Sequence, residues 1–126
     1  TVEFHKGRLI YGRMAGKTVL AMQGRFHFYE GYSMKEVTFP VRVLKLVGIT
    51  HLFVSNASGG MNPDWQVGEI VLINDHINFF PEHPLHGKNI NELGPRFPDM
   101  SKCYDERLRN KAKLIALKNN PTTNLD

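Results

Sequence analysis

Two nearly continuous apolar runs constrain the fold of this chain more than any other feature. They cover residues 49–55 and residues 69–77. A strand with one face in water alternates apolar and polar residues, whereas a strand covered on both faces is apolar almost throughout. We therefore predict that each run is a buried strand.

The segment between Ser33 and Gly48 carries the signals of a helix. Ser33 followed by Glu36 is a capping-box pattern, which predicts the first turn of a helix. Gly48 is typical of the residue that follows a helix. Apolar residues recur at helical spacing and predict a buried stripe, comprising Val37, Val41, Leu44 and Val47.

Further elements are predicted before this helix and after the two apolar runs. Short apolar runs at residues 8–11 and 18–22 predict a hairpin, and residues 101–118 predict a final helix. Residues 79–100 lack periodicity and are rich in Pro and Gly. A loop this long in a compact domain is usually functional or part of an interface. Taken in order, these elements predict an α/β fold with a mixed central sheet flanked by helices.

The composition excludes several classes of protein. Of 126 residues, 41% are hydrophobic and 22% are charged, as in ordinary globular proteins. The net charge is +4, and we interpret the basic residues as a solvated basic helix rather than a site for an acidic partner. No basic run is interleaved with aromatic residues, so a nucleic-acid-binding module is disfavoured. Cys103 is the only cysteine and fits a reducing compartment. No apolar stretch is long enough to span a membrane, so we expect a cytoplasmic chain with no membrane partner.

Residues 24–32 hold the best candidate for a binding site. Arg25, His27 and Tyr29 fall at alternate positions, so an extended backbone would project all three side chains from one face. Arg suits a bidentate anion, His shares or transfers a proton near neutral pH, and Tyr covers an apolar or sugar-like surface. The pattern predicts an anion site beside a flat group.

A second anion-binding element is predicted at residues 56–60, which follow the first apolar run. Successive small residues let backbone N–H groups approach an anion closely, although a turn of this kind is more often only structural. His5 lies near the chain start and is a candidate for the same anion, with a plain surface histidine as the alternative.

A metal site is the main alternative for the remaining histidines. His76, His83 and His86 lie near one another in the sequence, and Asp75 adds a carboxylate. Their spacing matches neither a helical pair of ligands nor a zinc knuckle. We therefore predict no metal.

Several ordered motifs resemble one known family. They are QGRFHFYEGY at residues 23–32, VTFPVRV at 37–43, SNASGGMNP at 55–63, DHIN at 75–78 and RFPDMS at 96–101. Together they resemble the trimeric, mammalian-type purine nucleoside phosphorylases over roughly the N-terminal half of that family. The resemblance implies that residues 1–126 are one partial domain of nucleoside-phosphorylase type, here incomplete.

The resemblance also implies an activity and partners. Enzymes of this family are glycosyltransferases of purine salvage: they phosphorolyse purine (deoxy)ribonucleosides reversibly to the free base and (deoxy)ribose 1-phosphate. Phosphate is a co-substrate, no metal or organic cofactor is needed, and the assembly is a homotrimer. The alternative is a non-catalytic fragment that binds phosphate or only assembles with partner chains.

Site residues follow from the same resemblance. Arg25 and His27 are implied as the catalytic groups, and the phosphate-binding set comprises His5, Arg25, Phe26, His27 and the backbone N–H of Ala57. Tyr29 would pack against the ribose, and Phe97 would cap the ribose of a neighbouring subunit. Glu30 would support the phosphate loop. The residues that recognise the purine base would follow residue 126.

Overall fold

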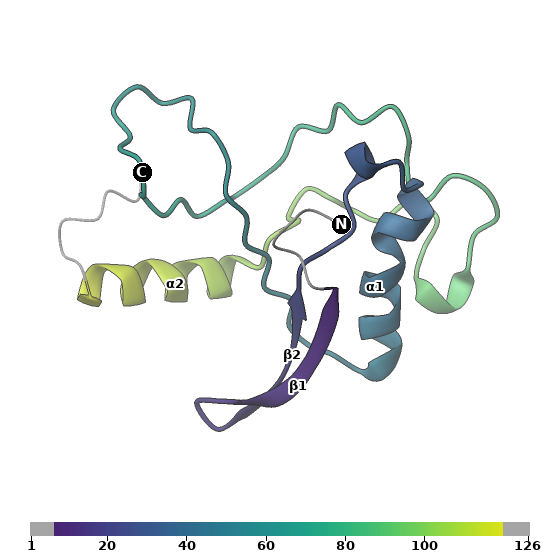
Figure 1. Cartoon of the computed structure of the whole chain (residues 1–126), viewed down its shortest axis with the longest axis horizontal. Helices are drawn as coiled ribbons and strands as arrows, with labels where there is room; N and C mark the ends of the chain where they lie inside the picture. Colours follow the sequence, from purple (N-terminus) through teal and green to yellow (C-terminus); the bar gives the residue numbers. More distant parts are fainter. Residues whose placement is uncertain (1–6, 120–126) are drawn as a thin grey trace. The chain divides into compact units, whose positions relative to one another are not determined.

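The computed structural model describes residues 7–119 and shows short regular elements joined by irregular segments. In chain order the elements are β1 (Arg8–Met14), β2 (Lys17–Gln23), the 3₁₀ turn η1 (Phe28–Glu30), α1 (Met34–Val47), the 3₁₀ turn η2 (Asn91–Leu93) and α2 (Glu106–Asn119) (Figure 1). The chain divides into two compact units. The first holds the described residues up to Leu52 with Pro81–Gly94, and the second holds Phe53–Phe80 with the described residues from Pro95 onward.

The predicted hairpin is confirmed. β1 and β2 pair antiparallel, from Arg8 opposite Gln23 to Met14 opposite Lys17. Ala15 and Gly16 form the two-residue connection, with φ angles of 47° and 76°. Two positive φ angles are the mark of a type I′ turn, whose twist matches that of the paired strands. Gly16 accepts this conformation freely, whereas Ala15 holds it against steric strain.

We expect Ala15→Asn to stabilise the hairpin by about 0.5–1 kcal/mol, because Asn tolerates positive φ better than Ala. The measurement is the exchange rate of the backbone amides of β1 and β2, which should slow by a factor of about 2–5. Gly16→Ala is the control and should speed the exchange. Faster exchange in Ala15→Asn would contradict the assigned turn.

Both ends of α1 are closed by the predicted signals. The Ser33 hydroxyl accepts the Glu36 N–H at 3.3 Å, and the Glu36 carboxylate accepts the Ser33 N–H at 2.8 Å. At the other end Gly48 has a φ of 93°, and the N–H groups of Gly48 and Ile49 donate back into the last turn. These contacts satisfy backbone groups that a helix end leaves without partners.

The predicted buried stripe of α1 is only partly present. Met34 and Leu44 are the only buried apolar residues in the part of the chain that the structure describes. Val37 is half-buried, but Val41 and Val47 are 47% and 62% exposed. The prediction was wrong for these two positions, because no other described helix or strand makes extensive contact with α1.

The capping box should make α1 sensitive to acid. Hydrogen bonds from the Ser33 backbone and hydroxyl lower the pKa of the Glu36 carboxyl. A carboxyl whose pKa is lower in the folded state contributes stability above its unfolded pKa and loses it as pH falls through the folded value. We expect helical circular dichroism to fall more in the parent than in Glu36→Gln between about pH 6 and about pH 3, since Gln keeps the acceptor but does not titrate. Equal losses in the two proteins would contradict this role.

The two predicted buried strands are absent. Within residues 7–119, neither residues 49–55 nor residues 69–77 form a strand, and the sheet holds β1 and β2 alone. Side chains of both runs are exposed, including Phe53 at 83% and Ile70 at 87%. A strand exists only through hydrogen bonds to a neighbour, and no described segment supplies one. The apolar pattern is therefore present without the sheet that it predicts.

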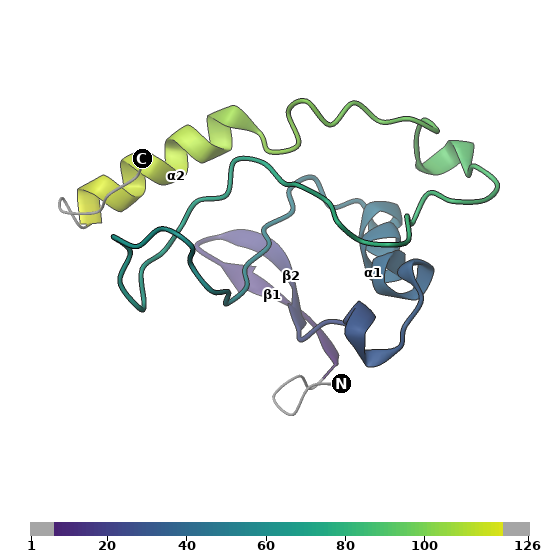
Figure 2. The same cartoon turned by 90° about the horizontal axis from the view of Figure 1, so that it is seen from above.

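The long loop is confirmed as irregular apart from η2. The Arg42 guanidinium of α1 donates to the Pro84 carbonyl of this loop at 3.4 Å. Within the first compact unit, the loop runs beside α1 (Figure 2). Asn89 donates to the Asn91 side chain at 2.7 Å and to the Gly94 carbonyl, which closes the turn around η2.

The final helix begins later than predicted, at Glu106 rather than residue 101. Asp105 accepts the Leu108 N–H at 3.0 Å, and this bond lowers the pKa of the Asp105 carboxyl. The helix therefore starts at its side-chain cap.

Among the described helices none is long and apolar enough to cross a membrane.

Candidate functional site

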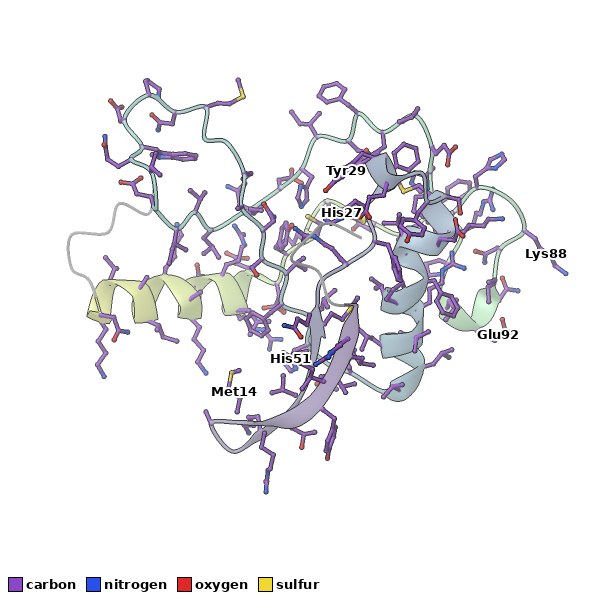
Figure 3. The ribbon with its side chains drawn as sticks, in the orientation of Figure 1. Met14, His27, Tyr29, His51, Lys88 and Glu92 are labelled. Atoms are coloured by element: carbon purple, nitrogen blue, oxygen red, sulfur yellow. The ribbon has the colours of Figure 1, made fainter. Side chains whose placement is uncertain are left out.

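The segment between β2 and α1 brings His27 and Tyr29 together. His27 has extended backbone angles, but Tyr29 lies in η1, so the predicted extended run through Tyr29 was wrong. The two rings nevertheless stack, with centroids 4.8 Å apart and planes at 22° (Figure 3). The 3₁₀ turn thus achieves what strand alternation was expected to achieve for this pair.

Glu30 fixes the position of His27. One Glu30 carboxylate oxygen lies 2.5 Å from His27 Nδ1 and accepts the His27 backbone N–H at 3.2 Å. The two side chains are only 16% and 13% exposed. The imidazole is therefore held between a carboxylate and an aromatic ring, an arrangement that orients a histidine before a ligand arrives.

Other contacts make the loop a built structure. The rings of Phe26 and Tyr32 meet edge to face, with centroids 5.0 Å apart. Gly31, with a φ of 95°, ends η1 and donates to the Phe28 carbonyl at 3.0 Å. Arg25 is exposed at the start of this loop.

This 3₁₀ turn was missed by sequence reasoning, although a signal was present. His27-x-x-Glu30 followed by Gly31 is a short capping pattern: the Glu carboxylate returns to the backbone N–H three residues earlier, and Gly supplies the left-handed exit.

The small-residue turn at residues 56–60 belongs to the second compact unit. Ala57 is exposed in an irregular segment. A Cβ placed on Gly60 would lie 2.9 Å from the Trp65 ring, so a larger residue here would displace that ring. Asn62 closes the following turn, accepting the Asp64 N–H at 2.9 Å and the Trp65 N–H at 3.2 Å. The turn therefore has a defined local shape.

Phe97 lies in another irregular segment of the second unit and is 87% exposed. The Arg96 guanidinium lies 6.0 Å from the centroid of its ring. Nearby, Asp99 accepts the Ser101 N–H at 2.9 Å, and that bond lowers the pKa of the Asp99 carboxyl. Phe97 thus presents a large apolar surface to solvent.

Two of the three histidines considered for a metal have other partners. The His76 ring is hydrogen-bonded to the Tyr104 hydroxyl, and Cys103 donates to Asp75 at 3.8 Å. His83 Nδ1 accepts the Leu85 N–H at 3.1 Å. Among the residues that the structure describes, no three His, Cys, Asp or Glu side chains are grouped to hold a metal ion. His5 lies outside the described residues.

Comparison with known families identifies the family to which this chain belongs. A family model described as the phosphorylase superfamily matches residues 1–124. The chain belongs to the phosphorylase superfamily.

Curated relatives within the phosphorylase superfamily are similar along most of this chain. Purine nucleoside phosphorylase 1 of Geobacillus stearothermophilus is 54% identical over 116 residues, which are 92% of this chain and 42% of the relative. The purine nucleoside phosphorylase of Mus musculus is 53% identical over 89% of this chain and 40% of its own length. The chain therefore spans about two fifths of the length of these relatives.

Solved structures of phosphorylases are also similar. The purine nucleoside phosphorylase of Schistosoma mansoni, in complex with BCX-34, has a TM-score of 0.87 and 44% identity, covering 95% of this chain and 46% of that chain. A purine nucleoside phosphorylase in complex with ribose-1-phosphate has the same TM-score and 45% identity. The predicted α/β class of nucleoside-phosphorylase type is confirmed. The strands expected at residues 49–55 and 69–77 remain an error.

Proposed function

We propose that this chain supplies the phosphate- and ribose-binding part of a purine nucleoside phosphorylase. The observation that carries the proposal is the 54% identity to a curated purine nucleoside phosphorylase over 92% of the chain. The loop that holds His27 between Glu30 and Tyr29 adds a physical reason, because it presents cationic and aromatic groups from a prearranged backbone.

The proposed reaction is reversible phosphorolysis. A phosphate oxygen forms a bond to C1′ of the nucleoside, the bond from C1′ to the purine nitrogen breaks with its electron pair, and a proton completes the free base. Positive charge develops on the sugar as that bond breaks. A phosphate held close to C1′ stabilises this charge and also removes the entropic cost of bringing two reactants together. Phosphate is the nucleophile itself, so the proposal includes no metal or organic cofactor.

Phosphate binding is assigned to Arg25, His27 and the backbone N–H of Ala57. Arg25 contributes a charge-assisted fork of donors, and His27 donates from a ring that Glu30 orients. Phe26 acts through the loop, since its contact with Tyr32 stabilises the backbone between those two donors. His5 completes the proposed set.

Contact with the sugar is assigned to two aromatic residues. Tyr29 is 75% exposed, and its ring offers a face to the ribose. The exposed Phe97 supports a role at a subunit boundary, where it would cover the ribose of a neighbour in a homotrimer. A cytoplasmic enzyme of purine salvage is the corresponding cellular proposal.

A second candidate function is a fragment that binds phosphate or assembles with partner chains without catalysis. The large number of exposed apolar side chains favours a chain that is covered by further polypeptide.

Phosphorolysis of inosine tests the proposed function. The assay uses this chain alone and a joined protein, in which the chain is continued by the part of the Geobacillus stearothermophilus relative beyond the matched region. We expect the joined protein to release hypoxanthine and ribose 1-phosphate only when phosphate is present. Release of free ribose without phosphate would contradict the proposal, and phosphate binding without turnover would favour the non-catalytic alternative.

A further inference from the structure

A clasp of four side chains joins two stretches of the second compact unit that lie far apart in the sequence. The His76 ring is hydrogen-bonded to the Tyr104 hydroxyl, and the two ring centroids lie 5.4 Å apart. One residue earlier on each stretch, the Cys103 thiol donates to the Asp75 carboxylate at 3.8 Å. Because two consecutive residues meet two consecutive residues, the clasp restrains both the distance and the direction of one stretch relative to the other.

Asp75 also fixes the backbone on its own side of the clasp. The carboxylate oxygen that accepts from Cys103 accepts the His76 N–H as well, at 2.8 Å. Tyr104 is half-buried, whereas His76 is exposed. Water can therefore compete for the bond between His76 and Tyr104, and we expect its contribution to lie at the low end of the range for protein hydrogen bonds.

Local structure carries the restraint from the clasp to Phe97. Pro98 follows Phe97 directly and limits its backbone, because the residue before a proline is biased toward extended conformations. Asp99 then accepts the Ser101 N–H at 2.9 Å and closes a turn. The clasp begins two residues after Ser101. The segment between Phe97 and the clasp is therefore short and shaped, rather than a free tether.

The helix α2 begins on the other side of the clasp. Asp105 directly follows Tyr104, its carboxylate accepts the Leu108 N–H at 3.0 Å, and its carbonyl accepts the Arg109 N–H at 3.0 Å. The clasp thus lies between the segment that carries Phe97 and the first turn of a helix of 14 residues. Loss of the clasp should loosen both neighbours.

We propose that His76 and Tyr104 are positioning residues for Phe97. They are assigned no contact with phosphate or nucleoside, and they act by holding the segment that presents the exposed Phe97 ring. The effect on the reaction rests on the proposed function, in which Phe97 covers a ribose. The clasp itself rests only on contacts within the second compact unit.

Hydrogen exchange in the joined protein tests the clasp. Tyr104→Phe keeps the ring and removes the hydroxyl that is bonded to His76. We expect the N–H groups of Ser101 and Leu108, which flank the clasp, to exchange about 2- to 5-fold faster in this variant. Tyr11→Phe removes the hydroxyl of an exposed tyrosine in β1 and should leave both rates unaltered. Unchanged exchange in Tyr104→Phe would overturn the proposal.

A double-mutant cycle shows whether His76 and Tyr104 act through the bond between them. His76→Ala and Tyr104→Phe should each raise the nucleoside KM about 2- to 5-fold without changing the phosphate KM, and the double variant should be no worse than either single one. His51→Ala is the control, since His51 is an exposed histidine bonded to the neighbouring Thr50. Additive losses, or an equal rise in the phosphate KM, would overturn the positioning role.

A conservative variant distinguishes lost positioning from general damage. His76→Gln places a side-chain amide near the position of the ring Nε2 and can bond the Tyr104 hydroxyl again. We expect it to bring the nucleoside KM and the two exchange rates back toward the parent values. Equal losses in His76→Gln and His76→Ala would overturn the assigned bond.

Phe97→Ala separates the clasp from the proposed function. If Phe97 covers the ribose, this variant raises the nucleoside KM, and adding Tyr104→Phe raises it no further. A further rise would show that the clasp acts elsewhere and would overturn its assignment to Phe97. Faster exchange in Tyr104→Phe, together with an unaltered nucleoside KM in Phe97→Ala, would count against the proposed role of Phe97 and leave the clasp standing.

Discussion

Replacing Arg25 with alanine is expected to raise the phosphate KM of the joined protein by about 30- to 700-fold, while the nucleoside KM changes far less. The substitution removes a charge-assisted anchor of about 2–4 kcal/mol, and each 1.4 kcal/mol corresponds to about a tenfold change in affinity. Phosphate is the ligand that Arg25 is proposed to hold, so the loss should fall on phosphate. Varying phosphate at saturating inosine measures it.

Arg13→Ala is the matched control for this variant. Arg13 is an exposed arginine of the hairpin whose guanidinium donates to the Gly16 carbonyl at 3.5 Å. Its loss changes the net charge by the same amount but should leave the phosphate KM unaltered. An unchanged phosphate KM in Arg25→Ala, or an equal rise in Arg13→Ala, would remove Arg25 from the proposed site.

Local sequence signals predicted the parts of the fold that local contacts determine. The ends of α1 follow from Ser33, Glu36 and Gly48, whose hydrogen bonds all lie within one helical turn. The hairpin follows from two short runs and a two-residue turn. In each case the stabilising partner lies in the same short stretch of the chain, so that stretch of sequence contains the whole interaction.

Prediction failed where the partner lies elsewhere. The apolar pattern of residues 69–77 indicates what these side chains need, namely burial on both faces, but it does not supply the neighbouring strand. The pairing of Asp75 with Cys103 and of His76 with Tyr104 joins residues 28 positions apart, and no periodicity reports it. The late start of the final helix has a different cause, because its cap, Asp105, is a local signal that the sequence-based prediction missed.

The candidate site shows the same division. Arg25, His27 and Tyr29 were identified from residue type and spacing. The stacked rings of His27 and Tyr29 confirm that these two residues lie together. The predicted backbone conformation was wrong, because the hydrogen bonds between Glu30 and His27 favour a 3₁₀ turn over an extended run. Ala57 and Phe97 lie in the second compact unit, and their roles stay predictions.

Tyr29→Ala should raise the nucleoside KM of the joined protein by about 5- to 30-fold, which corresponds to about 1–2 kcal/mol of lost contact between an aromatic ring and the ribose. Tyr11→Ala is the matched control, since Tyr11 in β1 is 74% exposed and Tyr29 is 75% exposed. Varying inosine at saturating phosphate gives the measurement. An unaltered nucleoside KM in Tyr29→Ala would exclude the ribose contact.

Tyr29 can act in two ways, by contacting the ribose or by holding His27 through ring stacking. Comparing Tyr29→Phe with Tyr29→Ala separates these two roles. Phenylalanine keeps the ring that stacks on His27 at 4.8 Å and that faces the sugar, but it removes the hydroxyl. If the ring contact with ribose is the main contribution, Tyr29→Phe restores the nucleoside KM and Tyr29→Ala leaves the phosphate KM near its parent value. If Tyr29 acts chiefly by holding His27, the phosphate KM of Tyr29→Ala rises together with the nucleoside KM, and the residue belongs to the phosphate loop instead.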